Sequence, residues 1–127
     1  MLWLVVLVGG GIGALARYEL GGWIQEAAGA GFPWGTLVIN VSGSLLLGVI
    51  YVLLEGSRAR PEWRAFLGVG FCGGYTTFST FSYEAFRLLQ DGQWNRATAY
   101  MIGSLLLALA GTLLGFYLGE SVLRLRG

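Results

Sequence analysis

Four runs of mostly apolar residues divide this 127-residue chain, and each is long enough to cross a lipid bilayer as a helix. A span needs about 20 apolar residues, because the hydrocarbon core is about 30 Å thick. Every backbone N–H and C=O in that core must be hydrogen-bonded, and a helix achieves this within one segment. The sequence therefore predicts an all-α membrane protein with a single transmembrane domain, residues 1–127. The four predicted spans cover residues 2–24, 34–54, 63–89 and 97–119.

Composition agrees with a multi-pass membrane protein and excludes several functions. Hydrophobic residues make up 55% of the chain and charged residues 12%, which leaves no room for a soluble domain. There is no histidine and only one cysteine, Cys72, so internal disulfides, common metal sites and His-dependent catalysis are excluded. The net charge is +1 without any lysine, and nothing points to nucleic acid. We expect no enzyme activity. We also expect no cleavable signal peptide, because no basic segment precedes the first apolar run.

The third predicted span contains a polar stretch that hydrocarbon does not tolerate alone. Residues 70–84 contain paired glycines near their start, Gly73 and Gly74, carry five Ser or Thr hydroxyls within residues 76–82, and end in Glu84. Such a run must be buried in protein or line a polar path. We interpret it as the lining of an ion path; the alternative is a helix contact with hydroxyls bonded back to their own helix. Poor helix propensity predicts a break between Gly73 and Thr77, which would expose carbonyl oxygens able to bind a cation.

Polar side chains also follow one face of the second span. Thr36, Asn40 and Ser44 are each four residues apart, which places them on one helical stripe. The stripe is compatible with a polar path and with an ordinary hydrogen bond between helices. Glu84 follows Thr80 by four residues, and this shared face favours a place on the path over an interfacial one.

Charge near the ends of the spans bears on orientation. Arg17 is interpreted either as an anchor that snorkels to lipid headgroups, which its position alone favours, or as a cation that draws anions into a vestibule. The side of the N-terminus carries five arginines and the opposite side three, a shallow positive-inside bias. A chain with so little bias is able to insert both ways, and two copies could then pair antiparallel.

The connections between the spans are short. We expect loops at residues 25–33, 55–64 and 90–96, the second of which is clearly hydrophilic. Two glycine stripes predict close helix contacts: Gly9 with Gly13, and a second stripe at residues 111, 115 and 119.

Three motifs carry a resemblance to a known family. The first is Gly10-x-x-Gly13-Ala14-x-x-Arg17-Tyr18. The second is Pro33-Trp34-Gly35-Thr36-Leu37-x-x-Asn40-x-x-Gly43. The third, which is the most specific, is Gly70-Phe71-Cys72-Gly73-Gly74-Tyr75-Thr76-Thr77-Phe78-Ser79-Thr80-Phe81-Ser82-x-Glu84. Together they resemble the CrcB/Fluc family of small fluoride channels over nearly the whole chain.

The resemblance implies an antiparallel, dual-topology homodimer with two fluoride pores and a structural sodium ion at the dimer interface. It implies that the backbone carbonyls of Gly73 and Thr76 hold the sodium. It also implies a set of pore-lining residues: Asn40, Phe78, Phe81, Ser79, Thr80, Tyr100 and Ser104. The polar stripes add Thr36 and Glu84 to this predicted set. Arg17 is the residue predicted for the vestibule.

These features predict a passive, fluoride-selective channel of the inner membrane that exports fluoride from the cytoplasm and relieves fluoride toxicity. Asn, Ser and Thr supply donors that replace water around the anion, and aromatic rings add a positive edge. The alternative is a proton-coupled, small multidrug-type exporter of cationic compounds, which needs a carboxylate deep in a span. The first, second and fourth spans have none in their middles. A structural membrane subunit is a third hypothesis.

Overall fold

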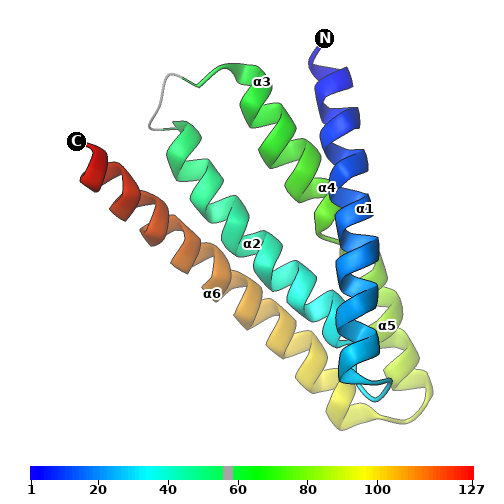
Figure 1. Ribbon diagram of the computed structural model, residues 1–127. Helices are drawn as coiled ribbons and strands as arrows, with labels where there is room; N and C mark the ends of the chain where they lie inside the picture. Colours follow the sequence, from blue (N-terminus) through cyan, green and yellow to red (C-terminus); the bar gives the residue numbers. More distant parts are fainter. Residues whose placement is uncertain (56–58) are drawn as a thin grey trace.

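The computed structural model describes residues 1–55 and 59–127, and every regular element in these residues is a helix (Figure 1). The long helices are α1 (Leu2–Ala28), α2 (Trp34–Glu55) and α6 (Trp94–Arg126). These three are long and apolar enough to cross a membrane. The predicted all-α class is therefore confirmed, and three of the four predicted spans fall in helices that are candidates for crossing a membrane.

The third predicted span is a broken run of shorter helices. The helix α3 (Pro61–Trp63), the π-helix η1 (Arg64–Cys72) and α4 (Gly73–Tyr75) follow one another without a gap. Two extended residues come next, Thr76 with φ −84° and ψ 158° and Thr77 with φ −149° and ψ 126°. The helix α5 (Phe78–Gln90) then continues. The predicted break is thus present, at the C-terminal end of the expected interval, and no single piece of this run has the length of a span.

The helices run up and down, so that both termini and α3 lie at one end of the molecule (Figure 1). The α1–α2 and α5–α6 connections lie at the opposite end, as the sequence predicts. Both connections are shorter than expected, because α1 continues to Ala28 and α6 already begins at Trp94. Part of the predicted hydrophilic loop, including Arg58, lies outside the described residues, and its end belongs to α3 and η1.

Glycines allow the helices to pack with their backbones in contact, as the two stripes predict. A Cβ atom at Gly13 would clash with the carbonyl of Phe71, and one at Gly74 with the carbonyl of Gly10. These contacts hold α1 against η1 and α4. On the other side of the molecule, a Cβ at Gly115 of α6 would clash with the carbonyl of Leu45 in α2. Larger residues at these positions would push the helices apart.

The buried core is small and lies toward the end of the molecule that carries the two connections. It consists of side chains from α2, α5 and α6: Leu37, Ala85, Leu88, Ala97 and Tyr100. Many large apolar side chains elsewhere remain exposed, including four leucines of α6: Leu105, Leu106, Leu107 and Leu109. So much exposed apolar surface requires lipid or another protein surface as its environment.

Candidate ion path

The centre of the candidate site is the break between α4 and α5, where Asn40 pairs with the extended backbone. Asn40 donates from Nδ2 to the carbonyl of Thr77 at 3.0 Å, and its Oδ1 accepts from the Thr77 N–H at 2.8 Å. One carboxamide thus satisfies both polar groups of a residue that has left the helix. Asn40 therefore makes a hydrogen bond between helices, which is one of the two interpretations of the polar stripe. Its place on an ion path stays a prediction.

Thr77 also starts α5. Its Oγ1 accepts from the N–H of Thr80 at 3.2 Å, which is the hydrogen bond of a helix N-cap. The same Oγ1 lies 3.2 Å from the Thr80 hydroxyl and 3.4 Å from that of Ser79. Three hydroxyls of the polar stretch therefore gather around the first turn of α5.

Arg17 reaches the other side of the break. Its Nε donates to the carbonyl of Gly74 at 3.1 Å, across 57 positions of sequence. Arg17 also lines the cavity described next. The side chain is therefore turned inward to the third segment and the cavity wall, which favours the vestibule interpretation over an anchor to lipid headgroups.

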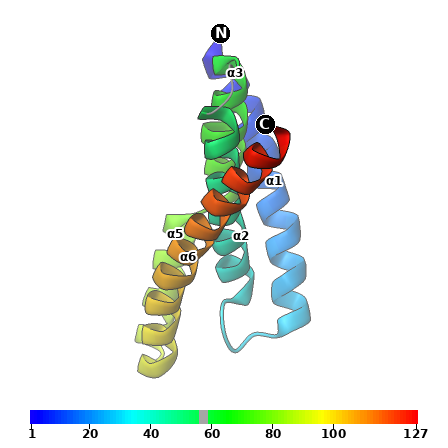
Figure 2. The ribbon, with the colours of Figure 1, turned by 90° about the vertical axis from the view of Figure 1, so that its left-hand side faces the viewer.

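A cavity of about 580 Å³ lies between α1, α2, α5 and the beginning of α6; we call it the vestibule. Figure 2 shows α5 and the beginning of α6 diverging from α1 and α2 toward this end of the molecule. Three arginines and two carboxylates line the vestibule: Arg17, Arg87 and Arg96 with Glu84 and Asp91. The wall therefore carries a small excess of positive charge, which favours anions.

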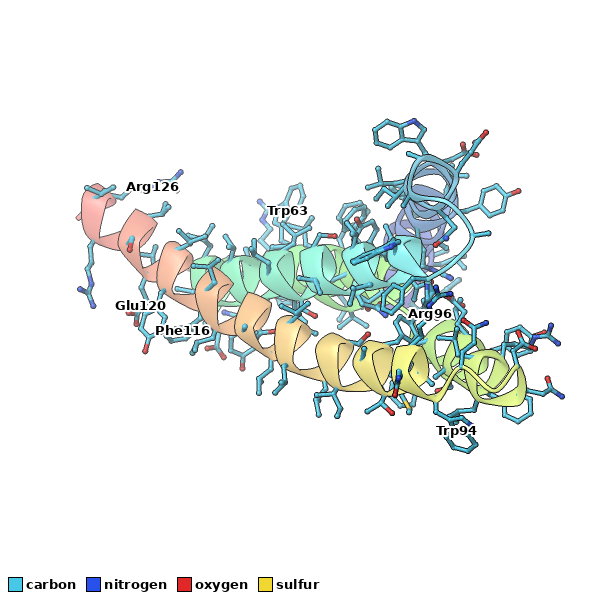
Figure 3. All side chains as sticks on the ribbon, turned by 90° about the horizontal axis from the view of Figure 1, so that it is seen from below. Trp63, Trp94, Arg96, Phe116, Glu120 and Arg126 are labelled. Atoms are coloured by element: carbon cyan, nitrogen blue, oxygen red, sulfur yellow. The ribbon has the colours of Figure 1, made fainter. Side chains whose placement is uncertain are left out.

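Two polar contacts shape the vestibule wall. Thr36 donates its hydroxyl to Glu84 Oε1 at 2.5 Å, which joins α2 to α5. Arg96 donates to the carbonyl of Gly31 and to Gln93 Oε1, both at 2.9 Å. In the view from below, Arg96 points from α6 toward the neighbouring helices, whereas Trp94 points away from the molecule (Figure 3).

A second cavity of about 700 Å³ lies on the far side of the break, among α2, η1, α5 and α6. Its lining includes Asn40, Ser104 and the rings of Phe78 and Phe81. Thr77 lines this cavity and the vestibule as well. The Asn40–Thr77 pair therefore stands at the boundary between two spaces that together extend along the third segment.

The two rings of the polar stretch differ in their surroundings. Phe78 is 80% exposed, and its ring centroid lies 5.6 Å from that of Phe81. Phe81 packs on the buried ring of Tyr100 at 5.1 Å. One chain therefore leaves the Phe78 ring largely uncovered beside the second cavity.

Two buried hydroxyls lack a hydrogen-bond partner within residues 1–55 and 59–127. They are Tyr100 Oη and Ser104 Oγ, one helical turn apart on α6. A buried hydroxyl without a partner costs free energy, so such groups are rare unless water, an ion or another chain satisfies them. Both belong to the predicted pore set.

The backbone at the break fits a cation site made of carbonyl oxygens. In the described structure the carbonyls of Gly73 and Thr76 accept no hydrogen bond, because the Thr77 and Thr80 N–H groups bond to side chains instead. No cluster of His, Cys, Asp or Glu that could hold a metal occurs among the same residues. Main-chain carbonyls are suitable ligands for a hard monovalent cation.

The structure thus divides the predicted site residues into three groups. Arg17, Thr36, Thr80 and Glu84 line the vestibule, while Asn40, Phe78, Phe81, Ser104, Gly73 and Thr76 line the second cavity; Ser79 and Tyr100 line neither. Whether these residues contact a permeating ion stays a prediction. Sequence reasoning did not single out Thr77, although a Thr directly before a helical turn is a recognisable N-cap.

Comparison with known proteins shows which family the chain is similar to. The family model described as "CrcB-like protein, Camphor Resistance (CrcB)" matches residues 4–116. Three curated proteins, all named fluoride-specific ion channels, are similar over most of their length. One from Thermus thermophilus is 49% identical over 94% of each chain. That of Leifsonia xyli is 50% identical over 91% of this chain and 85% of its own, and that of Acidobacterium capsulatum is 44% identical over 96% and 98%.

These matches confirm the resemblance that the three motifs carry, and they agree with a channel rather than an enzyme. With the three apolar spans they also identify a multi-pass protein of the inner membrane. The chain belongs to the CrcB family.

Proposed function

We propose that this protein is a passive, fluoride-selective anion channel that lets fluoride leave the cytoplasm and so relieves its toxicity. The single observation that carries this proposal is the similarity, at 49% identity over 94% of each chain, to a relative named a fluoride-specific ion channel. The geometry supports it, because a positively lined vestibule and a second cavity meet at the donor-rich break.

The chemistry of the lining suits a small, strongly hydrated anion. Fluoride loses much of its water in a narrow passage, and hydroxyl and amide donors must replace that water. Donors of this kind line the two cavities on three helices: Thr36 and Asn40 on α2, Thr80 on α5, and Ser104 on α6. The edges of Phe78 and Phe81 add weak positive contacts. Among the described residues, the lining of the second cavity includes no lysine or arginine, so an anion is able to bind there and leave again.

The working unit in this proposal is an antiparallel homodimer with two pores. The exposed apolar surface, the largely uncovered Phe78 ring and the unpartnered Tyr100 and Ser104 hydroxyls support a second copy that completes the path. The shallow arginine bias permits the opposite insertion that such a pair needs.

A sodium ion held by the Gly73 and Thr76 carbonyls belongs to the same proposal. The two carbonyls are free of other hydrogen bonds among the described residues, and Gly73 is exposed on the single chain, where a second copy would supply further ligands. A sodium ion bound there would add fixed positive charge beside the anion path.

The proton-coupled exporter is not favoured by any observation. Its function would require an ionisable carboxylate at the centre of a substrate pathway. The carboxylate that follows the hydroxyl run, Glu84, lies in the vestibule wall and accepts a hydrogen bond from Thr36.

The deciding experiment is anion efflux from liposomes that contain the purified protein. Vesicles loaded with potassium fluoride should release fluoride after valinomycin is added, and vesicles loaded with potassium chloride should release little chloride. Protein-free vesicles are the control. Comparable chloride and fluoride release would contradict the selectivity, and no fluoride release would contradict the function.

A further inference from the structure

Breaking a helix leaves backbone groups that the protein must satisfy in another way. In an unbroken helix the carbonyl of Gly74 would accept from the N–H of Phe78, but Phe78 begins a new helix after two extended residues. The Gly74 carbonyl instead accepts from Arg17 Nε. The carbonyl of the neighbouring residue Gly73 accepts no hydrogen bond in the described structure. Of these two carbonyls, Arg17 therefore bonds only to that of Gly74.

Close packing fixes the position of Arg17 relative to this carbonyl. Gly13 and Arg17 are four residues apart and share a face of α1. On that face α1 touches the backbone of the third segment, since a Cβ at Gly13 or at Gly74 would clash with the facing helix. The guanidinium therefore reaches the break from a helix that has little freedom to shift.

Arg17 and Asn40 approach the break from two different helices. Asn40 of α2 bonds to Thr77, the second extended residue, and Arg17 of α1 bonds to Gly74, in the last turn of α4. The backbone between these two points contains only Tyr75 and Thr76. Both ends of the interruption are thus tied to a neighbouring helix by a side chain.

We infer that Arg17 is a positioning residue that holds the last turn of α4, and hence the helix break, through the hydrogen bond from its Nε to the carbonyl of Gly74. Its charge in the vestibule is a second property, separable from this one. The positioning role of Arg17 rests on the proposed function only in the experiment that measures ion flux. The local structure of the break can be measured without any ion.

Two neutral substitutions separate the hydrogen bond from the charge. In Arg17→Gln the side-chain Nε2 is as many bonds from the Cα as the Nε of arginine, so a donor remains near Gly74 without the charge. Arg17→Met has a similar length, no charge and no donor. Any difference between the two variants therefore reports the donor, because both have lost the charge equally.

The first measurement is amide hydrogen exchange of the full-length protein in lipid nanodiscs. We expect peptides that cover residues 72–81 to exchange severalfold faster in Arg17→Met than in Arg17→Gln, as for loss of one hydrogen bond between uncharged groups, and the rate in Arg17→Gln to lie nearer that of the wild type. Peptides from the middle of α6 should exchange equally in all three proteins and serve as the internal control.

The second measurement is fluoride efflux from liposomes. Both variants lose the steering charge, so both should be slower than wild type, but Arg17→Gln should be severalfold faster than Arg17→Met. Equal exchange and equal efflux in the two variants would overturn the positioning role. If Arg17→Met does not assemble, Arg17→Leu, which also lacks the charge and the donor, takes its place: faster exchange at the break than in Arg17→Gln supports the role, and equal exchange contradicts it. Wild-type protein without fluoride efflux would refute the proposed function and leave the exchange result standing.

Discussion

Replacing Asn40 by alanine should destabilise the protein by about 2 kcal/mol, because it removes both hydrogen bonds that tie Thr77 to α2. Hydrogen bonds inside membrane proteins average about 0.6 kcal/mol and reach about 1.7, and a buried group left unpaired costs about 1–3 kcal/mol. Taking about 1 kcal/mol for each of the two contacts gives the total. This free energy corresponds to about a 30-fold change in the equilibrium constant between the state in which the two hydrogen bonds are formed and the state in which they are broken.

The matched control for this prediction is Ser44→Ala. Ser44 lies one helical turn from Asn40 and lines the same second cavity, but among residues 1–55 and 59–127 its hydroxyl bonds only to the Asn40 carbonyl of its own helix, at 2.7 Å. Unfolding in mixed micelles, followed by loss of helical circular dichroism, should give a free energy of unfolding that is clearly lower for Asn40→Ala and nearly unchanged for Ser44→Ala. Equal stability of the two variants would refute the reasoning, since it would mean that the carboxamide does not hold the break.

Three further predictions follow from the two cavities and the helix contacts. Phe78→Ile and Phe81→Ile should each abolish fluoride efflux from liposomes while the protein elutes at the same volume as the wild type; unchanged efflux would show that the ring does not line the path. Tyr100→Phe should slow efflux without lowering the melting temperature, because the Tyr100 hydroxyl has no hydrogen-bond partner in the described structure; a large loss of stability would show that it bonds to protein. Gly115→Ala should lower the free energy of unfolding by about 1–3 kcal/mol, because its Cβ would clash with α2. Gly103→Ala is the control and should not destabilise the protein, because there is open space at its Cβ. Equal melting temperatures of the two variants would contradict the close contact at Gly115.

The break illustrates what the sequence predicts well and what it does not. Low helix propensity around the paired glycines predicts an interruption between Gly73 and Thr77, and the interruption is there. Gly73 itself is helical, however, with φ −64° and ψ −37°, and the extended residues are Thr76 and Thr77. Propensity could not separate these positions, because Gly74 serves the contact with α1 and Thr77 is held out of the helix by Asn40.

Arg17 shows why position along a span was a poor guide to its role. Its place near the end of the first span fits a headgroup anchor as well as a vestibule cation. The observation that favours the vestibule interpretation is a hydrogen bond to a carbonyl 57 positions further along the chain. Such a contact depends on how α1 packs against α4, and no local pattern encodes that packing. Local spacing is more informative where both residues share one helix: Tyr100 and Ser104 lie four residues apart and are both buried.

The location of both chain ends on one side of the molecule limits how two copies of this protein could be joined covalently (Figure 1). A short peptide from the C-terminus of one copy to the N-terminus of the next would place both in the same orientation. A single polypeptide that reproduces an oppositely inserted pair would need an odd number of extra crossings in its linker. Gene duplication followed by simple fusion is therefore not a route to a one-chain version of such a channel, whereas duplication with an added hydrophobic segment is.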